Sequence, residues 1–269
     1  MLQQTPVARV LPAYDSWLER WPDPAALAAA APGDAVRAWG RLGYPRRALR
    51  LHDAARACVE RHDGSVPSSL AQLQALPGVG RYTAAAVASF AYGQRHAVVD
   101  TNVRRVHARA VGAVSSPAPT TSAAEWRIAE ALLPADAARA ARWGVGVMEL
   151  GALVCTARLP RCGECPVSSV CAWLRVGRPE RTGPVRRAQA YVGTDRQCRG
   201  RLLAALRDSD RPVARGALDL LWPVATQRDR ALSSLLADRL VERADHDAFQ
   251  LPTSRSELTH TDGDVRSPA

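Results

Sequence analysis

Four cysteines past the middle of the chain constrain its fold more than any other sequence feature. Cys155, Cys162, Cys165 and Cys171 form the pattern C-x6-C-x2-C-x5-C. Four thiols so close together, in a chain with no recognisable secretory signal, predict a metal centre rather than disulfides. Zinc would accept four cysteines, but structural zinc sites commonly pair two short arms, whereas only one arm is short here. The spacing therefore favours a [4Fe-4S] cluster over zinc.

The charge of the chain predicts a polyanionic partner. Its 36 basic residues, all of them arginine, outnumber 26 acidic residues and give a net charge of +10 over 269 residues. Forked guanidinium groups favour bidentate contact with phosphates. A GC-rich genome would account for the missing lysine, but not for the excess over acid. Because no apolar run approaches a membrane span, we expect a soluble, cytoplasmic protein that contacts no membrane.

Hydrophobic periodicity predicts an all-α body for the N-terminal part of the chain. Apolar residues recur three and four positions apart there, and no strand-like alternation competes with them. Proline, glycine and aspartate separate the helical segments. Helices are expected over residues 3–20, 24–30, 34–41, 46–61 and 68–75.

A second, smaller module is expected near the C-terminus. Three helical segments followed by a hairpin pattern predict a winged-helix-like α+β fold. Its near-neutral charge fits packing or protein contact at least as well as DNA binding. A stretch with eight arginines against two acids, residues 174–201, precedes it and is interpreted as a linker that lies along a phosphate backbone or is simply solvated. The expected elements are helices at 197–207, 214–222 and 227–239 and strands at 240–244 and 248–251.

Two helices of the body are predicted to meet at a tight glycine turn, residues 76–80. Gly78 and Gly80 allow another group to approach the backbone closely, and the helix that follows begins with unpaired amides. The turn is interpreted as a phosphate seat, with a merely structural helical corner as the alternative. Further along, Asp100 follows an apolar run and precedes a helix, which fits either an N-cap or a placed catalytic acid.

In this order, the hairpin, the aspartate eighteen residues past Tyr82 and the cysteine pattern resemble the helix-hairpin-helix DNA glycosylases of the endonuclease III superfamily. The opening MLQQTPV, the segment WGRLGY at 39–44 and the hairpin LPGVGRYT at 76–83 resemble its adenine-DNA glycosylase family, of the MutY type. The resemblance covers residues 1–172. It implies a six-helix-barrel part at 1–114 and an iron-sulfur domain at 115–173. Composition and periodicity place the linker at 174–194, the winged-helix-like domain at 195–252 and a disordered tail at 253–269.

The resemblance also implies a role for each matched residue. Asp100 would stabilise positive charge at C1′ of the target deoxyribose, or bond to it transiently, as adenine departs. Asn102 would hold Asp100 or the sugar, and Tyr82 would support the oxocarbenium-like transition state. The [4Fe-4S] cluster would be held by the four cysteines. Contacts with double-stranded DNA are implied for Gln3, Gln4, Thr5, Tyr44, Leu76, Gly78, Val79, Gly80 and Arg81.

The expected reaction is hydrolytic removal of adenine mispaired with 8-oxoguanine or guanine, by a monomer. A lyase that cuts the strand through an imine needs an amine, and a chain without lysine offers only its N-terminus. The enzyme is therefore expected to be monofunctional. The basic surface would offset the cost of extruding the base from the duplex.

One part of the family pattern is not matched. The family's general acid is a glutamate three residues before the MLQQT segment, and this chain begins at that methionine. Either Met1 is an internal start, or the acid step is impaired and excision is slow. The second domain is also too short for the MutT-like domain that reads 8-oxoguanine in many relatives. Two alternatives stay open: a thymine or uracil mismatch glycosylase of the same superfamily, and a non-catalytic DNA-binding iron-sulfur protein.

Overall fold

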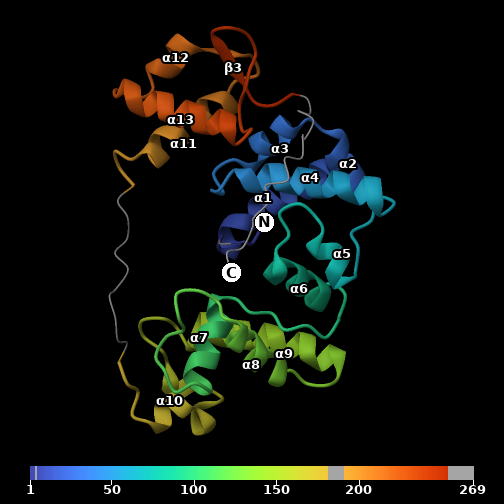
Figure 1. The fold of residues 1–269 in the computed structure, drawn as a ribbon, viewed down its shortest axis with the longest axis vertical. Coiled ribbons are helices and arrows are strands. Elements are labelled where there is room, and N and C mark those ends of the chain that lie inside the picture. The colour runs from blue at the N-terminus through green and yellow to red at the C-terminus, as the bar shows by residue number, and fades with distance from the viewer. Residues whose placement is uncertain (4, 181–190, 254–269) are drawn as a thin grey trace, which may run out of the picture. The chain divides into compact units, whose positions relative to one another are not determined.

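The computed structural model describes residues 1–3, 5–180 and 191–253, and the chain folds into two compact units (Figure 1). The split unit combines residues 1–64 with the chain from residue 189 onward, and the central unit contains residues 65–188. No described helix is both long and apolar enough to cross a bilayer. The predicted divisions at 114, 173 and 194 stay predictions. Residues 181–190 of the predicted linker and residues 254–269 of the predicted tail lie outside the described residues.

The N-terminal half of the split unit is helical, as the periodicity predicts. The first helix begins at Val7 rather than at residue 3, because Pro6 occupies its N-cap position. Asp23 caps the second helix by accepting a hydrogen bond from the Ala26 amide at 2.8 Å. Gly40, with φ +51°, ends the third. The helices are α1 (Val7–Arg20), α2 (Pro24–Ala29), α3 (Pro32–Trp39) and α4 (Arg46–Arg61).

The C-terminal half of the split unit has the predicted winged-helix-like order of elements. Its three short strands form an antiparallel sheet in the order β1-β3-β2, with Phe249 of β3 opposite both Val213 and Arg243. The sequence pattern missed β1, because two residues are too few to show an alternation. The elements are α11 (Asp195–Arg207), β1 (Val213–Ala214), α12 (Arg215–Asp219), α13 (Ala225–Ala237), β2 (Glu242–Arg243) and β3 (Ala248–Gln250).

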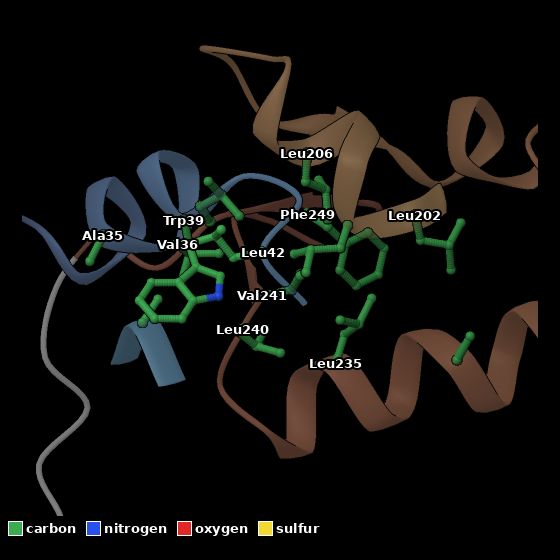
Figure 2. Close-up of a cluster of buried hydrophobic side chains, with 14 of the residues drawn as sticks. Ala35, Val36, Trp39, Leu42, Leu202, Leu206, Leu235, Leu240, Val241 and Phe249 are labelled. Carbon is green, nitrogen blue, oxygen red and sulfur yellow. The ribbon is translucent and has the colours of Figure 1, made fainter. Parts of the chain in front are cut away.

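The two halves of the split unit share one hydrophobic core (Figure 2). Trp39 lies at its N-terminal side, where its ring centroid is 5.7 Å from that of Trp17 in an edge-to-face contact. The C-terminal module contributes a comparable set of fully buried side chains. The module therefore packs against the N-terminal half of the same unit, in agreement with the packing role expected for it. The labelled core residues are Ala35, Val36, Trp39, Leu42, Leu202, Leu206, Leu235, Leu240, Val241 and Phe249.

Backbone meets backbone where the segment after β3 crosses the start of α3. The Gly33 amide donates a hydrogen bond to the Pro252 carbonyl oxygen at 2.7 Å. A Cβ added at Gly33 would lie 2.6 Å from that oxygen and 2.9 Å from Cβ of Leu251. Only glycine fits there without displacement of the chain.

The central unit has helices and no strand over residues 65–180, the part of it that the structure describes. Side chains cap three of its helices: Asp100 caps α7, Ser122 forms a capping box with Glu125 at α8, and Asp136 caps α9. The predicted fold class, helical with a small C-terminal sheet, is thus confirmed. The helices are α5 (Leu70–Gln74), α6 (Arg81–Phe90), α7 (Thr101–Ala110), α8 (Ala123–Ala131), α9 (Ala137–Glu149) and α10 (Ala172–Arg175), with a π-helix η1 (Leu150–Val154) and 3-10 turns η2 (Cys162–Glu164) and η3 (Ser168–Val170).

We expect Gly33→Ala to destabilise the split unit by about 1–3 kcal/mol, because the added methyl group overlaps the segment after β3. Gly216→Ala is the matched control, since a Cβ at that helical glycine would meet nothing within 4 Å. It should be neutral or stabilising by up to about 1 kcal/mol. Chemical denaturation followed by circular dichroism measures both changes. Equal effects would show that the contact with residues 251–252 does not hold the module in place.

Candidate active site and metal centre

The predicted hairpin is formed by α5, α6 and the turn between them. Leu76 is buried under the turn, and the Val79 amide donates to its carbonyl oxygen at 3.1 Å. Gly78 has φ +75°, which only glycine adopts without strain. Gly80, the N-cap of α6, is exposed, and a Cβ added to it would meet nothing within 4 Å. Packing within the chain therefore does not explain the glycine, whereas close approach of an external phosphate to the helix N-terminus would.

Asp100 stands at the start of α7 with both carboxylate oxygens engaged. Its Oδ1 accepts a hydrogen bond from the Val103 amide at 2.7 Å, so Asp100 is the N-cap of α7. Its Oδ2 accepts from the Asn102 amide group, Nδ2, at 2.9 Å. The carboxylate is only half-buried, and its rotamer is fixed from two sides. Capping and chemistry are compatible here, because a carboxylate retains lone pairs beyond those two bonds.

Tyr82, in the first turn of α6, lies within electrostatic range of Asp100. Burial raises the pKa of the Tyr82 phenol, and the negative charge of Asp100 raises it further. Both causes favour the neutral form, so the hydroxyl remains a hydrogen-bond donor throughout the physiological pH range. The structure thus brings together Tyr82, Asp100 and Asn102, the three residues predicted to be catalytic.

Arg105 connects Asn102 to the segment that leads into the cysteines. Its NH2 group donates to Asn102 Oδ1 at 2.7 Å and to the Gly151 carbonyl at 2.6 Å, and its Nε donates to the Cys155 carbonyl at 2.7 Å. Gly151 lies in the π-helix η1, where an added Cβ would be 2.7 Å from Cβ of Asn102. The extra residue per turn of a π-helix, common at functional sites, lets η1 press against Asn102. Sequence reasoning missed Arg105, although its spacing three residues after Asn102 on one helix was visible.

The four predicted metal-ligating cysteines follow η1 in a loop of short turns. Arg109 of α7 donates from NH1 to Cys155 Sγ at 3.3 Å, and its guanidinium lies 4.7 Å from the ring centroid of Trp173. The thiol of Cys171 points to the Arg109 carbonyl at 3.7 Å. Both ends of the cysteine loop are therefore fastened to α7.

The donor set of this loop fits an iron-sulfur cluster better than a single metal ion. Burial raises the pKa of Cys165, and the charges of the other three cysteines raise it as well, so the four sulfurs lie within electrostatic range of one another. Four cysteine thiolates are the ligand set of a [4Fe-4S] cluster, in which each sulfur binds a different iron.

Apart from Arg81, the remaining predicted DNA-binding residues belong to the split unit. Tyr44 is 62% exposed and has φ +48°, a conformation that costs energy for a bulky residue and is often stored at functional sites. Thr5 is buried, and its hydroxyl accepts from Arg47 NH2 at 2.7 Å. Gln3 is half-buried, and Gln4 lies outside the described residues. In the central unit, Arg81 stacks on Trp126 at 3.8 Å.

Arg47 of α4 joins the N-terminal segment to the loop that carries Tyr44. Its guanidinium donates to the carbonyl oxygens of Met1 and Gln3 on one side and of Gly43 on the other, the first at 2.9 Å and the last at 3.1 Å. It also lies 5.5 Å from the ring centroid of Tyr44. The sequence offered no signal for this residue, because most of its partners are backbone carbonyls.

Comparison with known proteins gives two family matches and several close relatives. Residues 1–131 match the HhH-GPD superfamily base excision DNA repair proteins, and residues 155–171 match the iron-sulfur binding domain of endonuclease III. The chain is 55% identical to adenine DNA glycosylase of Mycobacterium tuberculosis H37Rv over 254 residues, which is 94% of this chain and 83% of the relative.

Two solved structures share the fold. A thermostable thymine-DNA glycosylase aligns with a TM-score of 0.59 and 29% identity, over 65% of this chain and 80% of its own. A non-covalent endonuclease III-DNA complex aligns with a TM-score of 0.57 and 25% identity, over the same shares. The iron-sulfur match confirms the predicted [4Fe-4S] cluster, with Cys155, Cys162, Cys165 and Cys171 in the matched segment.

Cys162→Ser is expected to lower the iron and sulfide content of the purified protein and to weaken its thiolate-to-iron absorption, because one ligand is lost. Cys58→Ser is the matched control, since Cys58 is a buried core residue of α4 in the split unit. The control should keep its iron even if it is less stable. Elemental analysis measures both proteins, and stoichiometric zinc in place of iron would contradict the assignment.

Arg105→Met is expected to lower the free energy of unfolding by about 2–4 kcal/mol, because it leaves the Asn102 and backbone oxygens without their charged donor. Arg142→Met removes an exposed arginine of α9 and should change that free energy by less than about 0.5 kcal/mol. Denaturant titrations of the two variants give the comparison. A small effect at Arg105 would mean that water replaces the guanidinium.

Proposed function

Because the chain belongs to the adenine DNA glycosylase family of the HhH-GPD superfamily, we propose that it removes adenine mispaired with 8-oxoguanine or guanine from double-stranded DNA. The reaction is hydrolysis of the N-glycosidic bond in base excision repair, by a protein that holds a [4Fe-4S] cluster. The observation that carries this proposal is the pairing of Asp100 with Asn102 beside Tyr82. Intracellular DNA as the substrate agrees with the cytoplasmic location expected from the sequence, and the enzyme is proposed to act as a monomer.

Asp100 is suited to stabilise positive charge on the sugar as the base leaves. Its two hydrogen bonds fix the carboxylate before the substrate arrives, so no reorganisation is needed as charge develops at C1′. Tyr82 remains a neutral phenol and presents a donor to the same region. Asn102 orients the carboxylate and is itself held by Arg105. The [4Fe-4S] cluster, when bound by the four cysteines, supplies a rigid anchor for the loop that Arg105 contacts.

DNA binding would use features of both units. The open N-terminus of α6 at Gly80 is suited to a backbone phosphate, and Arg81 follows it directly. Tyr44, exposed and in a strained backbone conformation, would fill the stack that the flipped base leaves. The net charge of +10 supports attraction to the duplex at low salt. Thymine release is the alternative that the thymine-DNA glycosylase neighbour favours, so thymine opposite guanine belongs in every assay.

Asp100→Asn is expected to slow adenine release at least about 100-fold, because the amide keeps the geometry but loses the negative charge. Single-turnover excision on a duplex with adenine opposite 8-oxoguanine measures the rate. Affinity for the same duplex should be unchanged, which separates chemistry from binding. Thymine release in place of adenine, or an undiminished rate in the Asp100→Asn variant, would contradict the proposal.

The wild-type enzyme is expected to form no covalent adduct when borohydride is added during turnover, because its side chains offer no amine. Tyr82→Lys places an amine beside Asp100 and should yield a trapped protein-DNA complex. The control is Tyr82→Arg, which adds a cation that is too weak a nucleophile. Efficient trapping by the wild type would show a lyase.

Because the pKa of Tyr82 is raised, its ionisation should not lower the wild-type rate below about pH 10.

A further inference from the structure

The winged-helix-like module, residues 195–252, contacts the beginning of the loop that carries Tyr44. Arg207, at the end of α11, donates from Nε to the Val36 carbonyl at 3.0 Å and from NH1 to the Gly40 carbonyl. Burial lowers the pKa of this guanidinium to about 10. Arg37 of α3 returns the contact by donating to the carbonyl oxygens of Arg207 and Ser209. The last turn of α3 and the last turn of α11 are thus fastened by two crossed arginines.

The same module contacts the far end of that loop. Asp238, at the end of α13, accepts from Arg46 NH1 at 3.1 Å, only two residues past Tyr44. Arg199 of α11 binds the other oxygen of Asp238 and holds it in place. Between the two anchors, Leu42 is 7% exposed and belongs to the core that includes Val241 and Phe249 (Figure 2). The loop 40–46 is therefore held at its start, middle and end by residues of the module.

Three arginines on the helices of the module are paired with its own carboxylates. In DNA-binding helix-turn-helix folds, the recognition helix offers free side chains to the major groove. Here Arg228 of α13 pairs with Asp219, and Arg230 pairs with Asp195 through two hydrogen bonds. Arg215 pairs with Asp219 as well. Cations committed to carboxylates within the module contribute little to a phosphate contact.

We propose that the winged-helix-like module is the support for the loop 40–46, and that Arg207 and Asp238 are positioning residues for base excision. They hold the loop in the conformation in which Tyr44 has a positive φ and a 62% exposed ring. Gly40 and Gly43, both with positive φ and nothing within 4 Å of an added Cβ, leave the loop dependent on contacts from outside it. The module supplies these contacts together with Arg9, Trp39 and Arg47 of the N-terminal half. The inference rests on the proposed insertion of Tyr44 into DNA.

The test compares Arg207→Met and Asp238→Asn with Asp195→Asn, all in the full chain. Asp195→Asn breaks the exposed ion pair with Arg230 in the same module but touches no part of the loop. Each variant is also combined with Tyr44→Ala in a double-mutant cycle. Adenine release is measured under single-turnover conditions, and 2-aminopurine placed beside the mispair reports base extrusion by its fluorescence.

Arg207→Met and Asp238→Asn are expected to lower base extrusion and the single-turnover rate about tenfold each, the size expected for lost charge-assisted hydrogen bonds. In the Tyr44→Ala background they should change either quantity less than about twofold, because both act through Tyr44. Asp195→Asn should match the wild type. Two results would overturn the inference in favour of a module that contacts DNA itself. One is a loss of excision rate that multiplies with the loss caused by Tyr44→Ala, and the other is a weaker affinity for undamaged duplex in both backgrounds.

A second measurement reads the loop without DNA. Trypsin cleaves after arginine, and Arg41 lies exposed in the loop. Cleavage there should be about tenfold faster in Arg207→Met and Asp238→Asn than in Asp195→Asn if the module orders the loop. Equal cleavage in all variants would overturn the support role. If Tyr44→Ala excises adenine like the wild type, the proposed function of Tyr44 is wrong, and so is the proposed link between the module and excision. The cleavage rates still show whether the module orders the loop.

Discussion

The buried guanidinium of Arg105 is the interaction on which the central unit depends. Its donors reach Asn102 on α7, Gly151 in the π-helix and Cys155 at the start of the metal-binding loop. An ammonium could not span these acceptors, because its three donors radiate from one atom. The position of the Asp100 carboxylate is therefore set, through Asn102, by the same side chain that holds the cluster loop. The cysteine loop and the proposed catalytic carboxylate thus share one support.

The split unit holds the loop 40–46 in place by contacts that come from outside the loop. Two glycines let the chain turn at positions 40 and 43, and this freedom would leave Tyr44 mobile in isolation. Hydrogen bonds to carbonyl oxygens from Arg47 and Arg207 remove that freedom from two directions. A chain without lysine uses its arginines here as rigid forks for backbone oxygens rather than as surface charge.

Local patterns predicted most of the helices, the hairpin, the cap at Asp100 and the cysteine loop, because spacing along the chain determines each of them. Arg105 and Arg47 were missed because their partners are mainly carbonyl oxygens, whose positions depend on the tertiary fold. Periodicity also showed which faces of the C-terminal helices are apolar, but not that they would pack on Trp39 and Val36. Nothing in the sequence indicated that Gly33 must be a glycine, because only the packing of the segment 251–252 against it leaves no room for a side chain. The roles assigned to the site residues stay predictions.

The discontinuous build of the split unit sets an order for synthesis on the ribosome. Helices α1–α4 emerge first, but the side chains that complete their core, among them Leu202, Leu235 and Phe249, are translated last. The central unit has all of its sequence available earlier and can fold while the first helices still expose Trp39. During that interval the nascent chain carries an apolar surface that chaperones recognise. A premature stop codon before α11 would leave this surface uncovered for good, and a chain ended there would be directed to aggregation or proteolysis rather than to repair.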